Sequence, residues 1–430
     1  MDDFELQRVF HQITATSSPL EALNIYEQYF DLLKDWRIIY AANDDHGPFK
    51  LQNRVVDSST GICSIFRGQS LWVIDANMAG TEGEVPYLAG TGTYFDSNAA
   101  SFIYSLGYKE KFGPELRKQL GRIQSLGVDY RSINPYLYLF ENRKHFDTKP
   151  ENIEYGRKTF AVMTALSKIA GPLDESWREM YKKYFLEQCE ESIAPLFKNF
   201  LSWHQNGEFN LLDYQFSLTE LLLLETKILD ITTKDKNEHK LEMLIQFMDE
   251  KLQVMMLREI AVCADILFNG NSTQLTKKIR KINHHHPDSL GIIHGCAWDL
   301  FMFRVMDWFS NTSNEFGVDF YISNLVSCDK DVLDVAELTK LKAIALHNDS
   351  HEYVIFQDNS PEEILFSILG EDKREFLLNL FNYESRQKRI GWTQKKNNKE
   401  IYAGKNKIIQ ALLMEKREEL TSLISHGSFS

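Results

Sequence analysis

The chain has 430 residues, of which 43% are hydrophobic and 12% aromatic, which excludes wholesale disorder and allows a large buried core. Its formal net charge of -13 excludes non-specific nucleic acid binding by the surface as a whole, although it is compatible with a local basic groove. The five cysteines form no CxxC pair, which excludes a zinc ribbon and suits the reducing cytoplasm, the expected location.

Residues 1–90 are predicted to form an N-terminal α+β lead-in. Ser18-Pro19-Leu20-Glu21 is a capping box that opens a helix, short strand-like runs follow, and the glycine-rich stretch 79–92 marks a boundary. The first residues lack the pattern of a signal peptide. No apolar run reaches the roughly 18–20 residues of a membrane span, so no membrane partner is expected.

Residues 91–358 are predicted to form an α/β core, which a helical insertion interrupts at about 150–285. In the insertion, apolar residues recur at the i, i+3, i+4 spacing of amphipathic helices. On either side of it, strand-like and helix-like segments alternate. Residues 359–430 are predicted to be a helical C-terminal region with a basic segment. The sequence therefore predicts an α/β fold that is mostly helical overall.

Four acidic residues lie in segments where a carboxylate is costly to bury unless it pairs with a cation. They are Asp96 in Phe95-Asp96-Ser97-Asn98 after a strand, Glu141 in an aromatic helix, Asp299 at the head of an apolar helix, and Asp329 in Ser327-Cys328-Asp329-Lys330-Asp331 after a strand. Mg²⁺ and Mn²⁺ prefer hard oxygen ligands. Convergence of these acids would suit phosphodiester cleavage.

Each acid also has a purely structural interpretation. Aspartates that follow a strand and precede a helix are favoured N-caps, which applies to Asp96 and Asp329 and is the favoured interpretation of Asp331. Glu220, at the head of another apolar helix, is a rival to Glu141 as the second acid. Asp299 could be neutralised by Arg304 in a buried ion pair.

The order of these motifs resembles that of the PIN-like nuclease superfamily. The resemblance covers residues 92–147 and 288–358 and leaves out the insertion. It implies a Rossmann-type parallel sheet with its acids at one edge, and a metal-dependent endonuclease that cleaves RNA, or less expectedly DNA. It also implies Mg²⁺ or Mn²⁺ as cofactor. The implied metal ligands are Asp96, Glu141, Asp299, Asp329 and Asp331, the first four of them catalytic, with Asn98 and Ser327 contacting the substrate.

A basic segment supports a nucleic acid substrate. Residues 386–407 hold eight basic residues and one acid, with Trp392 and Tyr402 interleaved. Basic residues beside aromatic ones suit phosphate contacts and base stacking. Arg389, Lys395 and Lys396 are therefore predicted to bind the substrate, and a solvated linker is the alternative.

Two functions from different classes follow. The first is a metal-dependent endonuclease, in a toxin-like or defence role. The second is a non-catalytic helical scaffold or interaction protein, in which the acids are caps and ion pairs. The extensive helical regions would suit a homo-oligomer or a regulatory protein partner in either case.

Overall fold

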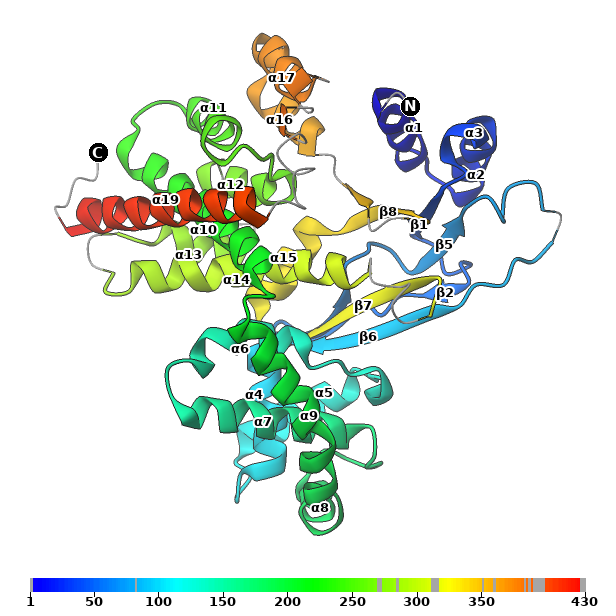
Figure 1. The fold of residues 1–430 in the computed structure, drawn as a ribbon, viewed down its shortest axis with the longest axis vertical. Coiled ribbons are helices and arrows are strands. Elements are labelled where there is room, and N and C mark those ends of the chain that lie inside the picture. Colours follow the sequence, from blue (N-terminus) through cyan, green and yellow to red (C-terminus); the bar gives the residue numbers. More distant parts are fainter. Residues whose placement is uncertain are drawn as a thin grey trace.

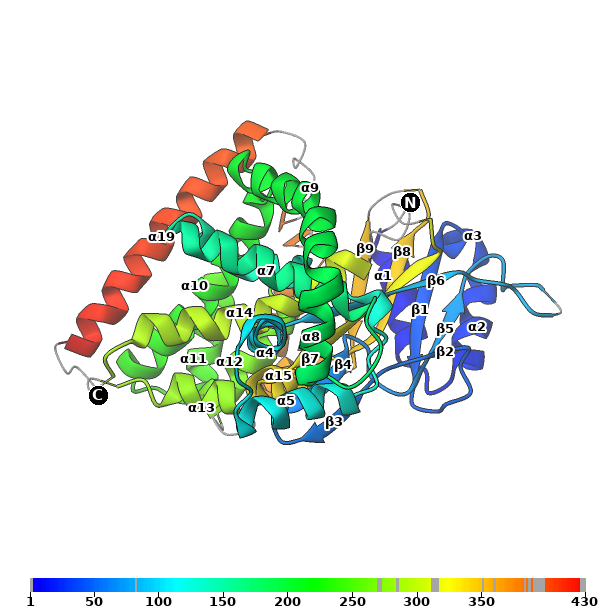
Figure 2. The same cartoon turned by 90° about the horizontal axis from the view of Figure 1, so that it is seen from below.

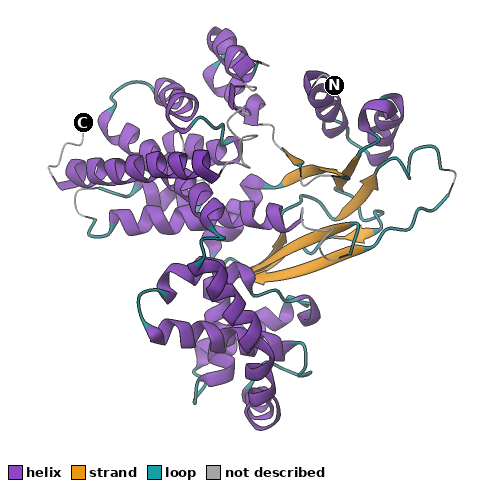
Figure 3. Ribbon diagram, viewed as in Figure 1, coloured by secondary structure: helices purple, strands orange, loops and turns teal. Residues whose placement is uncertain are grey.

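The fold is α/β and mostly helical, with the strands gathered in one part of the molecule and helices building the rest (Figures 1 and 3). None of the helices in the described ranges is long and apolar enough to cross a membrane. The computed structural model describes residues 3–81, 83–268, 273–283, 286–310, 317–349, 352–358, 361–382, 384–385, 388–389 and 399–425.

The strands form two sheets, ordered β2-β5-β1-β8-β9 and β3-β4-β7-β6. Only the pair β6 and β7 is parallel, and the other neighbours are antiparallel. The strands are β1 (Trp36–Ala42), β2 (Phe49–Lys50), β3 (Arg54–Asp57), β4 (Thr60–Ser64), β5 (Ser70–Ile74), β6 (Ala89–Phe95), β7 (Phe320–Ser327), β8 (Leu341–His347) and β9 (Tyr353–Gln357).

The described strands thus do not form the parallel Rossmann-type sheet that the sequence resemblance implies. Short connections between β3 and β4 and between β8 and β9 force antiparallel pairing, since parallel neighbours need a long crossover. The helical middle of the chain is long enough for β6 and β7 to run parallel, but β1 with β8 and β4 with β7 are as far apart in the sequence and are antiparallel. Among the described strands, the parallel pairing that the resemblance implies is therefore limited to β6 and β7.

Helices surround the sheets in three groups (Figures 1 and 2). The N-terminal group is α1 (Asp3–Thr14), α2 (Pro19–Gln28) and α3 (Phe30–Leu33). The group at the foot of Figure 1 is α4 (Ser97–Tyr108), α5 (Pro114–Ser125), α6 (Tyr136–Phe146), α7 (Pro150–Leu166), α8 (Glu175–Met180) and α9 (Leu186–Gln205), with the turns η1 (Tyr130–Ser132) and η2 (Tyr181–Phe185).

The third group lies on the left of Figure 1, where α19 packs along α10. It comprises α10 (Asn210–Thr232), α11 (Asn237–Phe247), η3 (Met248–Leu252), α12 (Leu257–Phe268), α13 (Gln274–Arg280), α14 (Ser289–Ser310) and α19 (Lys399–Ser425). The remaining helices are α15 (Lys330–Thr339), which follows β7, and α16 (Pro361–Leu369), η5 (Glu371–Lys373) and α17 (Arg374–Phe381), which follow β9.

The five-stranded sheet is buried on both faces because its side chains alternate between two cores. Ile38 and Tyr40 of β1 pack with α1 and α2 in a small core. Ile39 and Ala41 of the same strand belong to the main core, which continues through the helices. Since Ile39 of β1 pairs with Ile344 of β8, the predicted N-terminal lead-in and the predicted core share one sheet.

Candidate functional site

The parallel strands β6 and β7 bring two of the predicted acids to one sheet edge. Phe95, the last residue of β6, pairs with Val326 of β7, and the Asp96 amide donates to the Val326 carbonyl over 3.2 Å. Asp96 then begins α4 and Asp329 begins α15. The carboxyl ends of adjacent parallel strands are where sites form in α/β folds.

Asp96 is buried, with 3% of its surface exposed. One carboxylate oxygen accepts from the Ala99 amide over 2.6 Å, and the other accepts from the Ser327 hydroxyl. Burial raises the pKa of Asp96 to about 6, against the lowering effect of these two donors, and the charge of Asp329 adds to the rise. Asp96 is therefore a carboxyl that titrates close to neutral pH.

Asp329 links the two helices that follow the parallel strands. Its Oδ1 accepts from the Asp331 amide over 2.9 Å as the N-cap of α15, and its Oδ2 accepts from the Asn98 side chain over 3.1 Å. Its own amide donates to the Ser327 hydroxyl oxygen over 2.9 Å. The structure thus confirms that Asp96 and Asp329 are both helix N-caps.

Glu141 on α6 lies against the start of α4. Its Oε2 accepts from the Ser97 amide over 3.2 Å, and the neighbouring Asn142 donates to the Ser97 hydroxyl over 2.8 Å. Burial raises the pKa of Glu141 to about 7, with further contributions from the charges of Asp96 and Asp329. Glu141 therefore belongs to the same acidic group as the two caps.

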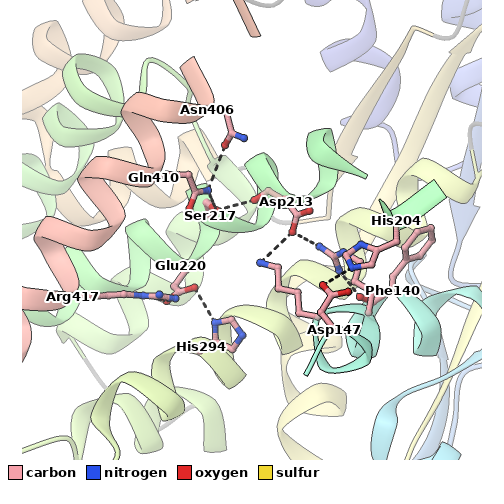
Figure 4. Close-up of polar contacts among 12 residues, drawn as sticks. Phe140, Asp147, His204, Asp213, Ser217, Glu220, His294, Asn406, Gln410 and Arg417 are labelled. Carbon is pink, nitrogen blue, oxygen red and sulfur yellow. Dashed lines mark hydrogen bonds and ion pairs between the residues drawn. The ribbon is translucent and has the colours of Figure 1, made fainter. Parts of the chain in front are cut away.

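The rival acid, Glu220 on α10, lies in a different environment (Figure 4). It is 1% exposed and is bound by Arg417 of α19 and by His294 of α14, whose Nδ1 lies 3.0 Å from Oε2. Burial raises the pKa of Glu220, but His294 and Arg417 outweigh it and hold the pKa below its usual value. The geometry thus favours Glu141 over Glu220 as the second acid.

Asp299 lies in the middle of α14 and not at the head of a helix. Burial, followed by the charges of Asp329 and Glu141, raises its pKa well above the usual value. Among the described residues it has neither a hydrogen bond nor an ion pair. The expected partner Arg304 binds Glu259 of α12 instead, so pairing with Arg304 is wrong as an explanation of Asp299.

Asp331, in the first turn of α15, is the one acid of the group that pairs with a cation among the described residues. The ammonium group of Lys278, on α13, forms an ion pair with its buried carboxylate. Burial raises the pKa of Asp331, against the effect of Lys278, and the charge of Asp329 adds to the rise. We call the five residues Asp96, Glu141, Asp299, Asp329 and Asp331 the acid cluster.

The acid cluster suits a hard divalent cation in chemistry but is not a finished ligand set. No three His, Cys, Asp or Glu side chains in the described ranges are arranged so that they could already hold a metal ion. The donors are nevertheless carboxylate oxygens, as Mg²⁺ and Mn²⁺ require. Among the described residues, only the carboxylate of Asp331 is neutralised by a cation, the ammonium group of Lys278.

The basic segment gives no support to the predicted substrate contacts. Arg389 is buried, and its guanidinium binds Asp249 over 2.6 Å and the carbonyl of Leu380, so these contacts occupy it in the structure and its role in substrate binding stays a prediction. Lys395 and Lys396 lie outside the described residues.

Three functional neighbours were missed by sequence reasoning. Ser97 and Asn142 connect Glu141 to α4, and they could have been found because each is adjacent to a predicted acid. Lys278 carries no local signal, because its pairing with Asp331 depends on how α13 packs against α15.

Comparison of the chain with protein family models, with curated proteins and with solved structures gives no significant match in any of the three.

Proposed function

We propose that the protein is a metal-dependent nuclease that cleaves phosphodiester bonds at the acid cluster, with RNA as the favoured substrate. The observation that carries the proposal is that Asp96, Glu141 and Asp329 are linked through Ser97, Asn98 and Ser327 at the ends of two parallel strands. Helix α14, which carries Asp299, packs against α6 and α15 beside them. Capping explains Asp96 and Asp329, and Glu141 also accepts the first amide of α4, but capping does not explain Asp299. Acids that raise one another's pKa are costly to keep together without a function.

The residues of the cluster divide by exposure. Glu141, Asp299 and Asp329 are partly exposed and would hold Mg²⁺ or Mn²⁺ from the solvent side. Asp96 is buried, so its carboxylate would add negative charge to the site without being reached from the solvent. A bound divalent ion would supply a water of lowered pKa and would stabilise the charge that develops on the phosphate.

The protein's own groups prepare these ligands. The Ser327 hydroxyl binds Asp96 and so favours its charged form, against the effect of burial. Asn98 holds Asp329 Oδ2 in place and is itself exposed, so its amide is also accessible to a substrate phosphate. The likeness to PIN-like nucleases is proposed for the segments β6-α4 and β7-α15 only, since the other described sheet pairs are antiparallel.

A helical scaffold is the second candidate, and one observation favours it. The cluster does not already form a ligand set in the described ranges, and two of its members are used as N-caps. In that case the acids would tune stability and no cation would be needed.

A cleavage assay separates the two candidates. End-labelled single-stranded RNA, duplex RNA and DNA are incubated with the full chain in Mg²⁺, in Mn²⁺ or in EDTA. We expect cleavage in metal only, and a loss of at least about 100-fold in Asp299→Asn, since even an outer partner of a metal ligand is typically worth about 10–100-fold.

The matched control is Glu337→Gln, an exposed acid on α15 outside the cluster. It should cleave like the unaltered protein. Cleavage that persists in EDTA and in Asp299→Asn would remove the metal mechanism. An absence of cleavage from every substrate, together with no change of melting temperature in Mg²⁺ or Mn²⁺, would favour the scaffold.

A further inference from the structure

One face of α4 leads away from the acid cluster. Ser97, Ser101, Tyr104 and Tyr108 follow each other at intervals of four, three and four residues, which places them on a common side of the helix. All four are partly exposed. The face begins inside the cluster, because the Ser97 amide binds Glu141.

Tyrosines cover the middle of this face. The ring of Tyr104 lies 4.1 Å from that of Tyr155, on α7, and 5.3 Å from that of Tyr108, measured between ring centroids. Tyr155 is 37% exposed, so part of its ring faces solvent. Lys158 lies over the Tyr108 ring at 5.1 Å.

The tyrosines lie close to the acids as well as to each other. Tyr138 lies one turn before Glu141 on α6, and its hydroxyl donates to the Thr159 hydroxyl of α7 over 3.3 Å. The Thr159 hydroxyl in turn donates to the carbonyl of Tyr155. The tyrosines of α4 and α7 thus lie beside α6, the helix that carries Glu141.

Basic residues, together with two glutamates, lie at the far end of the same face. Tyr108 contacts Tyr181 of η2 through their hydroxyls, 3.1 Å apart. Beyond that contact is a hollow of about 530 Å³, lined by Glu110, Arg178, Glu179, Lys182 and Lys183. Among the described residues neither Lys182 nor Lys183 forms an ion pair with an acid. At roughly 1.5 Å per residue, the 12 residues of α4 separate this hollow from the acids by about 18 Å.

Acids, stacked aromatic rings and free lysines in that order match the parts of a single nucleic acid strand. Aromatic rings bind unpaired bases regardless of sequence, and lysines bind the phosphates between them. A duplex would keep its bases paired and could not use the rings. Protein–protein interfaces use tyrosines but are depleted in lysine, so the two lysines favour a nucleic acid over a protein partner.

We propose that this face of α4 is the track of the substrate strand: Tyr104 and Tyr155 stack on an unpaired base, and Lys182 and Lys183 hold the phosphates beyond it. The proposal deepens the nuclease function above and rests on it for the position of the cleaved bond. Binding of the strand, however, does not require cleavage.

The test measures binding with cleavage switched off. A fluorescein-labelled single-stranded RNA of mixed sequence is titrated with the full chain in EDTA, and fluorescence anisotropy gives Kd. We expect Tyr155→Ala to raise Kd about tenfold and Tyr155→Phe to leave it nearly unchanged, because stacking needs a ring and not a hydroxyl. The double variant Lys182→Gln with Lys183→Gln should raise Kd and reduce its salt dependence.

The matched control is Tyr353→Ala on the edge strand β9, where the tyrosine is 36% exposed, almost the same as Tyr155. It should bind like the unaltered protein. Unchanged affinity in both Tyr155→Ala and the double lysine variant would overturn the track, and so would equal losses with the annealed duplex. Because the two lysines are on the surface, their variant remains informative even if Tyr155→Ala is misfolded.

The failure of this proposal differs from the failure of the nuclease function. Strand binding that depends on Tyr155, in a protein that cleaves nothing in Mg²⁺ or Mn²⁺, retains the track and removes the nuclease. Metal-dependent cleavage that does not change when Tyr155 or the two lysines are substituted would disprove the substrate track and leave the nuclease function in place.

Discussion

Asn98 donates a hydrogen bond of 3.1 Å to Asp329, a residue 231 positions later in the chain. The bond joins the first turn of α4 to the N-cap of α15. Both helix N-termini carry partial positive charge, which stabilises nearby carboxylates by roughly 0.3–1 kcal/mol each. Two helix ends can therefore offset part of the repulsion in the acid cluster, but they do not replace a cation.

Ser327→Ala should weaken the site and the fold together. The Ser327 hydroxyl is fully buried, donates to Asp96 and accepts from the Asp329 amide. Its loss leaves buried partners unsatisfied, at a cost of about 1–3 kcal/mol in the free energy of unfolding. It should also raise the pKa of Asp96 further, since Ser327 lowers it. Urea unfolding gives the stability, and cleavage rates give the effect on activity.

Ser323→Ala is the control for that variant. Ser323 lies on the same strand and is also fully buried, but its hydroxyl contacts Ser310 and the Met306 carbonyl instead of the acids. It should lose comparable stability and keep its metal response. Equal losses of activity at equal stability would show that Ser327 has no special role.

The stability of the metal-free protein should fall as pH rises from about 4 to 7. The pKa of Asp96 is raised to about 6 and that of Glu141 to about 7, so the folded protein binds more protons than the unfolded chain in this window. Their contribution to stability is therefore complete below pH 4 and is lost as the carboxyls ionise. Other groups titrate too, so the contribution is isolated as the difference between the unaltered protein and Asp96→Asn.

Mn²⁺ or Mg²⁺ should reverse that loss. A ligand at about 100 times its Kd stabilises the folded state by about 2.7 kcal/mol. The rise in melting temperature should be large near pH 7.5 and small near pH 5, where protons compete for the carboxylates. A metal effect that does not change with pH would place the ion elsewhere.

Glu141→Gln and Glu220→Gln should have opposite effects. Glu141 is repelled by its neighbours, so its neutral replacement should retain or slightly raise stability and abolish metal-dependent cleavage. Glu220 is buried and binds the partly exposed Arg417 and His294 (Figure 4), so its replacement should cost about 1–3 kcal/mol through the lost charged hydrogen bonds. Chemical unfolding and the cleavage assay, run on both variants, check the contrast.

If Glu220→Gln instead lost cleavage at full stability, Glu220 would be the catalytic acid and Glu141 a cap. The sequence alone could not decide this, because both residues stand in apolar helices. The difference comes from α19, which brings Arg417 to Glu220 from nearly 200 positions away. Long-range neutralisation of this kind leaves no mark in the local pattern.

Local sequence patterns were enough to predict the N-caps, because a cap depends on the residues next to it in the sequence. Asp96 and Asp329 follow strands and precede helices, and both are N-caps at one sheet edge, close to the positions that the motifs predict. Sheet direction was not predictable in this way. It depends on which strands become neighbours, and the pairing of β1 with β8 joins segments some 300 residues apart.

Lys278→Gln should increase the response to divalent ions. The Lys278 side chain is 51% exposed, yet its ammonium pairs with the buried carboxylate of Asp331. Its removal should cost about 1 kcal/mol near neutral pH, the upper range for a partly exposed pair. It also vacates the one cation that competes with a metal at the cluster. Mn²⁺ should therefore raise the melting temperature more in Lys278→Gln than in the unaltered protein.

Lys277→Gln, one residue earlier on α13, removes the same charge without touching Asp331, since Lys277 forms no ion pair among the described residues. Its Mn²⁺ response should match that of the unaltered protein. The difference between the two variants should shrink as the pH falls, because burial raises the pKa of Asp331 and its carboxyl then binds a proton in place of a cation. Identical Mn²⁺ responses in both variants at neutral pH would mean that Lys278 only holds α13 against α15. The metal would then not bind at Asp331.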